Sequence, residues 1–153
     1  MNRNHGFTMI ELIAVVIIVG ILAAFTLPHF LGRAAFDARG VHDSLASALR
    51  YAHKVAIASN CPVQVQIQTG SYSLQQRPQP CGSGAFSEPV LDPTRNSPFA
   101  DSNLHGVTLS PATTITFTAT GATASGANTT ISVTGAGRTR TLTVIGGTGY
   151  VRD

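Results

Sequence analysis

The hydrophobic residues of this 153-residue chain are concentrated close to its N-terminus. Residues 7–27 read FTMIELIAVVIIVGILAAFTL, in which Glu11 is the single charged residue. As a helix, this run would be about 31 Å long, close to the roughly 30 Å of a bilayer's hydrocarbon core. A cleaved secretory signal fits poorly, because the run is too long and no small-residue cleavage site follows it. The pattern therefore predicts a transmembrane helix over residues 7–30.

A second helical pattern follows and predicts an amphipathic continuation of the helix over residues 31–60. Apolar residues recur every three or four positions, as one stripe of a helix requires: Ala34, Ala38, Val41, Leu45, Ala48, Ala52 and Val55. The opposite face carries the polar residues Arg39, His42, Asp43, Arg50 and Lys54. The helix is expected to end near Asn60, because Cys61-Pro62 stops it.

Residues 61–153 have the pattern of a β-rich head. Residues 63–68 alternate strictly between apolar residues and glutamine, and the return strand carries Tyr72 and Leu74. Residues 77–104 are rich in Pro, Gly, Ser and Asp and predict a long surface loop. Further strands are predicted at 107–110, 114–118, 129–134 and 138–145, and the tail 146–153 closes or borders the sheet. The predicted fold class is α+β.

Charge changes this picture in two places. Arg3 precedes the apolar run, and positive charge there keeps the N-terminus cytoplasmic and sends the head outward. The formal net charge of +3 permits an anionic partner without requiring one. In the head, Arg138 and Arg140 lie two residues apart on a predicted strand, so they share a face and suit phosphate recognition. No acidic residue occurs between Asp101 and Asp153, which predicts a cationic end of the head.

The two cysteines leave two alternatives. In an exported domain Cys61 and Cys81 meet an oxidising compartment and can form a disulfide that closes a loop of about 20 residues. The other alternative is a pair of buried free thiols.

No residue pattern predicts catalysis or a cofactor. His42 and His53 are eleven positions apart, which does not suit a metal pair at i and i+4. Neither a nucleophile elbow nor a P-loop occurs. Asp92 and Asp101 could contribute to a calcium site, but two loop carboxylates are usually only solvated. We therefore expect neither an enzyme nor a metal-binding protein.

Glu11 is unusual because an ionisable group at membrane depth costs about 2.5–3.5 kcal/mol to insert. Its nearest candidate partner is the α-amine that a cut after Gly6 would create on Phe7, in the same molecule or in a neighbour. The sequence Gly6-Phe7-Thr8-Met9-Ile10-Glu11-Leu12, followed by an apolar run, resembles the type III leader of type IV pilins and type II secretion pseudopilins.

This resemblance implies how the N-terminus is processed and used. It implies that a prepilin peptidase cleaves the leader 1–6 between Gly6 and Phe7 and N-methylates Phe7. It also implies that Glu11 neutralises the N-terminus of an adjacent subunit during filament assembly. The chain would then cross the inner membrane once, in contact with its lipid, with the N-terminus cytoplasmic and the head periplasmic before it enters the filament.

The second half of the chain is similar to the GspH/FimT group, which includes type II secretion pseudopilin H and FimT-like minor pilins. The residues that carry this likeness are Ile115-Thr116-Phe117, Gly121, Ile131-Ser132-Val133, Gly137-Arg138-Thr139-Arg140 and Gly149-Tyr150-Val151. The resemblance implies a long N-terminal helix packed on a small antiparallel β-sandwich head. MSHA-type minor pilins share much of this layout, so the subgroup stays open.

The resemblance implies a minor pilin or pseudopilin, a structural subunit that helps to initiate a type II secretion pseudopilus or type IV pilus near its tip, together with other pilins. The alternative is DNA uptake, because Gly-Arg-x-Arg at this place in FimT-like minor pilins is associated with DNA binding. That reading assigns Arg138 and Arg140, with Arg152 nearby, to extracellular DNA. Otherwise the arginines face solvent or pair with a neighbouring pilin.

Overall fold

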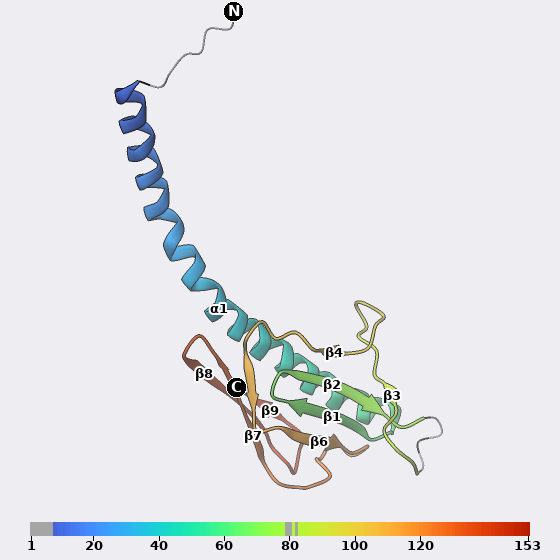
Figure 1. Ribbon diagram of the computed structural model, residues 1–153. Coiled ribbons are helices and arrows are strands. Elements are labelled where there is room, and N and C mark those ends of the chain that lie inside the picture. The colour runs from blue at the N-terminus through green and yellow to red at the C-terminus, as the bar shows by residue number, and fades with distance from the viewer. Residues whose placement is uncertain (1–7, 79–80, 82) are drawn as a thin grey trace, which may run out of the picture. The chain divides into compact units, whose positions relative to one another are not determined.

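The computed structural model describes residues 8–78, 81 and 83–153, and within this part it describes every side chain except those of 23–36. Within these described residues, one helix, α1 (Met9–Ser59), is followed by nine strands (Figure 1). The chain divides into two compact units, Met1–Arg33 and Ala34–Asp153.

In the first unit, α1 presents apolar side chains on all sides. All its described side chains are exposed, and the large apolar ones are Met9, Ile10, Leu12, Ile13, Val15, Val16, Ile17, Ile18, Val19, Ile21 and Leu22. The predicted leader, Phe7 and the side chains at the end of the predicted span, 23–30, lie outside the described residues. Within the residues that the structure describes, no helix has the length and hydropathy required to cross a membrane.

In the second unit, α1 buries one face, as its periodicity predicts. Ala38, Val41, Leu45, Ala48 and Ala52 are buried, whereas Val55 is half-buried at the border of the core. The side chain of the first predicted stripe residue, at position 34, lies outside the described part. The helix ends at Ser59, and the positive φ of 52° at the next residue, Asn60, is the left-handed conformation that commonly follows a helix.

One expectation about this helix is wrong. The sequence pattern places His42 on the polar face, but its side chain is buried, with 5% of the residue exposed. The buried surface of α1 is wider than the predicted stripe and also includes Ala46, Leu49 and Ala56. A helix that packs against sheets can bury more than the narrow seam that a spacing of three and four defines.

The strands form two antiparallel sheets. The first sheet has the order β3-β2-β1-β6, with β4 also paired to β2, and the second has the order β5-β7-β8-β9. The strands of the first sheet are β1 (Val63–Gln68), β2 (Ser71–Gln76), β3 (Glu88–Pro89), β4 (Ala100–Asp101) and β6 (Thr113–Phe117). Those of the second are β5 (Thr108–Ser110), β7 (Thr129–Gly135), β8 (Arg138–Val144) and β9 (Val151–Arg152).

The expectation that residues 77–104 form a surface loop without strands is wrong. This segment contributes two short strands, β3 and β4, to the border of β2. The Leu74 N–H donates to the Phe99 carbonyl at 3.0 Å, and the Val90 N–H donates to the Leu74 carbonyl at 3.1 Å. Val90 and Leu104 are buried. The segment therefore satisfies the backbone groups of β2 that would otherwise face water.

The core of the second unit lies where α1 and the two sheets meet. Leu45 and Leu49 of α1, Phe117 of β6, and Ile131 and Leu142 of the second sheet are all 0% exposed. Two contacts also tie α1 to the rest of the head: the Ser44 and Tyr72 hydroxyls are 2.6 Å apart, and Arg50 binds the Asp153 carboxylate at 2.7 Å. Every core residue of this cluster falls within residues 38–151.

Two glycines explain how the loops near the end of α1 close on the helix. Gly121 and Gly149 have positive φ values of 89° and 68°. A Cβ atom at Gly121 would lie 2.9 Å from His53 Nε2, and one at Gly149 would lie 2.6 Å from His53 Cδ2. His53 in turn packs edge-on against Phe117, with ring centroids 5.6 Å apart. These positions require glycine for both backbone conformation and space.

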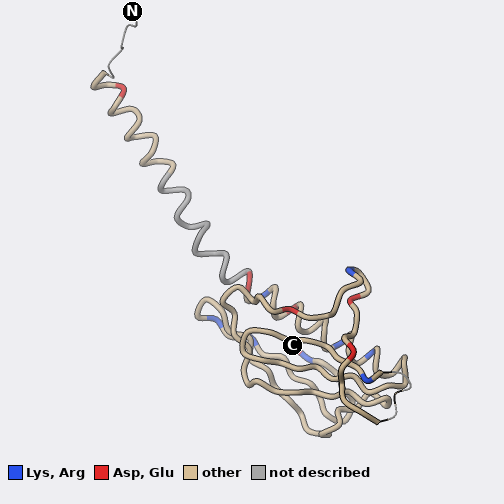
Figure 2. The backbone as a smooth tube through the Cα atoms, turned by 45° about the vertical axis from the view of Figure 1, so that its right-hand side comes forward, with Lys and Arg blue, Asp and Glu red and all other residues tan. Residues whose placement is uncertain are grey.

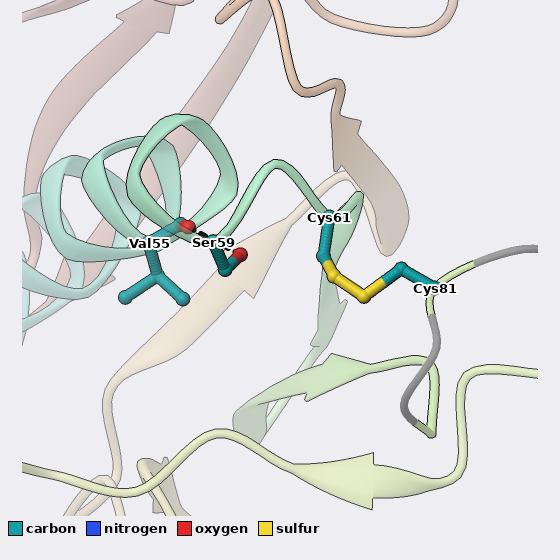
Figure 3. Close-up of a disulfide and its surroundings, with 4 residues drawn as sticks. All are labelled: Val55, Ser59, Cys61 and Cys81. Carbon is teal, nitrogen blue, oxygen red and sulfur yellow. Dashed lines mark hydrogen bonds between the residues drawn. A yellow bond between two sulfur atoms is a disulfide. The ribbon is translucent and has the colours of Figure 1, made fainter.

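A disulfide joins Cys61 to Cys81 (Figure 3). Cys61 follows the end of α1 and is buried, and the two Cα atoms are 5.4 Å apart. Of the two alternatives for the cysteines, the structure therefore has the disulfide, and it anchors the segment after β2 to the end of the helix.

Candidate functional site

The first turn of α1 holds Glu11 at a helix N-terminus. The Thr8 carbonyl accepts hydrogen bonds from the Glu11 and Leu12 N–H groups at 3.1 and 3.2 Å, and the Thr8 hydroxyl oxygen accepts from the Glu11 N–H at 3.4 Å. Thr8 and Glu11 thus have the spacing of a capping box, a signal that is present in the sequence but absent from our sequence-based interpretation. Among the described residues, no side chain or backbone group forms a hydrogen bond or ion pair with the Glu11 carboxylate.

The Glu11 carboxylate is therefore placed where negative charge is favoured, beside the positive end of the helix dipole. Gly6 and Phe7, the residues of the predicted cleavage and methylation site, lie outside the described part of the chain. Their roles, and that of Glu11 in assembly, stay predictions.

The β7–β8 hairpin carries the arginine pair. Ala136 and Gly137 have φ values of 51° and 71°, as the two-residue turn of a tight hairpin requires. Arg138 and Arg140 follow in β8, are exposed, and pair with Gly135 and Val133 of β7. They share a face, as the spacing predicts.

The structure does not bring Arg152 to the same face. Arg152 of β9 pairs directly with Thr143 of β8. Successive residues of a strand point to opposite faces, so Thr143 and Arg152 lie on the face opposite Arg138 and Arg140. The expected three-arginine group is therefore a pair on one face and a single arginine on the other.

α1 also carries an acidic residue, Asp43, whose pKa responds to His42 and, more weakly, to the charge of Arg140. The hydrogen bond between His42 Nδ1 and Asp43 Oδ1, 3.0 Å long, lowers the pKa of Asp43 below its ordinary value. The charges of Arg39 and Arg140 act in the same direction, and burial acts against them. Arg39 Nε lies 3.8 Å from Asp43 Oδ2, so the negative charge of Asp43 is already offset within α1.

Two hollows on the head lie between α1 and residues 92–105. One of about 450 Å³ is lined by Arg50, Tyr51, Lys54, Asp92 and Phe99, among others, and another of about 400 Å³ by residues of α1 with Asp101 and His105. Within the described residues, no group of three or more His, Cys, Asp or Glu side chains could hold a metal ion.

Asp92 and Asp101, the two candidate calcium ligands, each accept hydrogen bonds from residues two positions further along the chain. Asp92 accepts hydrogen bonds from the Thr94 N–H and hydroxyl at 2.8 and 2.6 Å, and these bonds lower the pKa of Asp92. Asp101 accepts from the Asn103 N–H at 3.0 Å. Figure 2 shows the acidic residues of the head along α1 and the segment from β3 to β4, whereas the β7–β8 hairpin is basic.

Comparison with known proteins identifies the family. Residues 42–148 match the family model described as type II transport protein GspH, and residues 1–27 match the prokaryotic N-terminal methylation motif. No curated protein sequence matches the chain.

Two solved structures have a similar fold. The minor pseudopilin EpsH from the type 2 secretion system of Vibrio cholerae is 18% identical, with a TM-score of 0.56 over 76% of this chain and 94% of that one. The type IV minor pilin FimU of Pseudomonas aeruginosa is 19% identical, with a TM-score of 0.53 over 74% of this chain and 90% of that one. The fold is therefore α+β and type IV pilin-like, as the sequence predicts.

Proposed function

This chain belongs to the GspH family of type II transport proteins, and we propose that it is a minor pilin or pseudopilin that enters a type II secretion pseudopilus or a type IV pilus through its N-terminal helix. The family and the similar structures are pilins and pseudopilins rather than enzymes, in agreement with the absence of a catalytic motif from the sequence. A subunit of this kind assembles with other pilins in a filament.

The observation that carries the proposal is the contrast along α1. Its second part packs into the head, whereas its described first part exposes apolar side chains on all sides and begins within the methylation motif. Exposed apolar surface of this extent needs an apolar partner. We infer that lipid of the inner membrane covers it before assembly, with the head in the periplasm, and that helices of neighbouring subunits cover it in the filament.

In this proposal a prepilin peptidase cleaves between Gly6 and Phe7 and methylates the new N-terminus. The Glu11 carboxylate then pairs with the N-terminal ammonium of an adjacent subunit, which sets the stagger between neighbouring helices. An ion pair in apolar surroundings loses much of its stabilisation when one partner is removed, because the other charge is left unpaired.

Replacing Glu11 tests the assembly role. Glu11→Ala should reach the membrane at the level of the unmodified chain but enter filaments roughly 10- to 100-fold less, since a hydrogen bond to a charged group contributes about 1.5–3 kcal/mol. The measurement is the ratio of filament-bound to membrane-bound protein on immunoblots of sheared cells. Glu88→Ala, at the exposed glutamate of β3, is the matched control. Unchanged incorporation of the Glu11 variant contradicts the role.

The comparisons do not support the alternative of DNA uptake, which stays a prediction. The similar structures are those of a minor pilin and a minor pseudopilin. The position of Arg152 on the face opposite Arg138 and Arg140 reduces the cationic surface that a duplex would meet.

A further inference from the structure

Strand β8 is longer than the strand that pairs with its outer edge. On its inner side, β7 pairs with every residue of β8, from Arg138 to Val144. On its outer side, β9 pairs only with Thr143 and Val144 (Figure 1). The first five residues of β8 therefore have no strand beside them on that side within the described part of the chain.

The direction of the backbone groups on this edge follows from the pairing of β8 with β9. The Ile145 N–H, just beyond β8, donates to the Tyr150 carbonyl at 2.8 Å, toward the side on which β9 lies. Backbone polar groups alternate sides along a strand, so those of Thr143, Thr141 and Thr139 point the same way. Thr143 meets β9, but Thr139 and Thr141 lie beyond the end of β9 and are exposed.

Other strand borders are paired over at least part of their length; on the outer border of β6, the Ala124 N–H donates to the Thr116 carbonyl at 2.8 Å. The border of β2 is paired by β3 and β4, and the Leu109 N–H of β5 donates to the Thr69 carbonyl at 2.8 Å. For Thr139 and Thr141, the structure records no hydrogen-bond partner on the outer side among the described residues. Two N–H and two C=O groups are thus available to an incoming strand.

The side chains beside these groups select the charge of the partner. Arg138 and Arg140 are exposed on one face of the edge, and no ion pair within the described residues involves either of them. A strand added in antiparallel register would place alternate side chains directly beside them. Charged residues on a free edge also keep unsuitable strands away. Two copies of this edge would bring arginines together, so a second copy of the chain is disfavoured.

We propose that the outer edge of β8, from Arg138 to Thr141, binds an extended peptide segment with acidic residues at alternate positions, which adds to the second sheet as an antiparallel strand. Thr139 and Thr141 supply the backbone hydrogen bonds, and the two arginines pair with the acidic side chains. Duplex DNA could pair with the arginines but could not use the backbone edge. The proposal goes beyond the role in a filament and does not depend on it.

The test uses the full chain in a non-ionic detergent and the fluorescein-labelled peptide Thr-Glu-Val-Glu-Val-Thr. In the expected register the two glutamates face Arg140 and Arg138, and the valine between them faces Thr139. Fluorescence anisotropy should show binding at low ionic strength. The double variant Arg138→Gln, Arg140→Gln should weaken it by about tenfold. Arg152→Gln, on the opposite face, should leave it unchanged.

Backbone-modified peptides separate strand addition from simple charge attraction. N-methylation of the valine between the glutamates removes the N–H that would donate to the Thr139 carbonyl, and it should weaken binding by about tenfold or more. N-methylation of the first glutamate alters an N–H that points away from β8 and should have little effect. Hydrogen exchange at the Thr139 and Thr141 amides should slow when the unmodified peptide binds.

Three results would overturn the proposal. The first is no binding of the unmodified peptide at low salt. The second is equal binding of the two N-methylated peptides, which indicates charge attraction alone. The third is binding of a labelled 20-base-pair duplex that depends on both arginines while the peptide does not bind, which assigns the pair to nucleic acid. None of these results affects the Glu11 test, so failure here is distinguishable from failure of the proposed function.

Discussion

The two parts of α1 both carry large apolar side chains but bury them to opposite extents. Ile13 and Ile17 in the first part are 53% and 57% exposed, whereas Leu45 and Leu49 in the second part are 0% exposed. The second part has a polar face, so one side can face water while the sheets cover the other. The first part has apolar residues on every side and offers no face that suits water. The periodicity of the apolar residues, rather than their number alone, decides whether the head of the same chain can cover that part of the helix.

The largest effect is expected from truncating a buried residue of the second part. Leu49→Ala should lower the free energy of unfolding by about 2–5 kcal/mol, because it removes buried methyl groups and leaves a cavity. Urea unfolding followed by circular dichroism measures the change. Leu12→Ala, at a residue that is 58% exposed, is the control and should leave this transition in place. Equal effects of the two substitutions would refute the contrast between the two parts.

The next largest effect concerns the disulfide that follows the buried part. Cys81→Ser should destabilise the head by roughly 3 kcal/mol, because it frees a loop of about 20 residues in the unfolded chain. The same urea transition, measured with and without a reducing agent, checks this value. The reducing agent should shift the unmodified chain and not the variant. If the unmodified chain takes up two alkyl groups before reduction, the disulfide is absent.

A smaller effect is expected from pH, through the contact between α1 and β2. Burial raises the pKa of Tyr72 above its usual value, although the hydrogen bond with Ser44 acts against this. A group with a raised folded-state pKa contributes stability that is complete below its unfolded pKa of about 10 and is lost as the pH rises through the folded-state value. The unfolding midpoint should therefore fall above about pH 10, and Tyr72→Phe should reduce this fall. An equal fall of the unfolding midpoint in the Tyr72→Phe variant would show that Tyr72 does not cause this fall.

The smallest effect is expected on the first part of the helix. Ile17→Ser should change the stability of the head by less than about 0.5 kcal/mol, because the residue is exposed within its own unit. Its insertion into membranes, measured by fractionation, should fall instead. A loss of head stability similar to that of Leu49→Ala would mean that the first part also contributes to the folded core.

Local patterns predicted much of the fold, because they report local structure. The alternation in β1 correctly placed Val63, Val65 and Ile67 inside, since side chains along a strand alternate between two faces whatever the partner. The two-residue strands β3 and β4 could not be predicted, because strands so short have no periodicity and exist only where β2 offers them hydrogen bonds. His42 was misplaced because the width of the buried helix face depends on the sheets that pack against it.

Some features of the candidate sites could likewise be predicted from the sequence, whereas others could not. The sequence alone determined the apolar run, the leader motif with Glu11, and the spacing that puts Arg138 and Arg140 on one face, because each depends on neighbours along the chain. Only the tertiary structure decided that Arg152 lies on the other face and that the outer edge of β8 is left open. These depend on strand pairing between residues far apart in the chain, which no local period encodes.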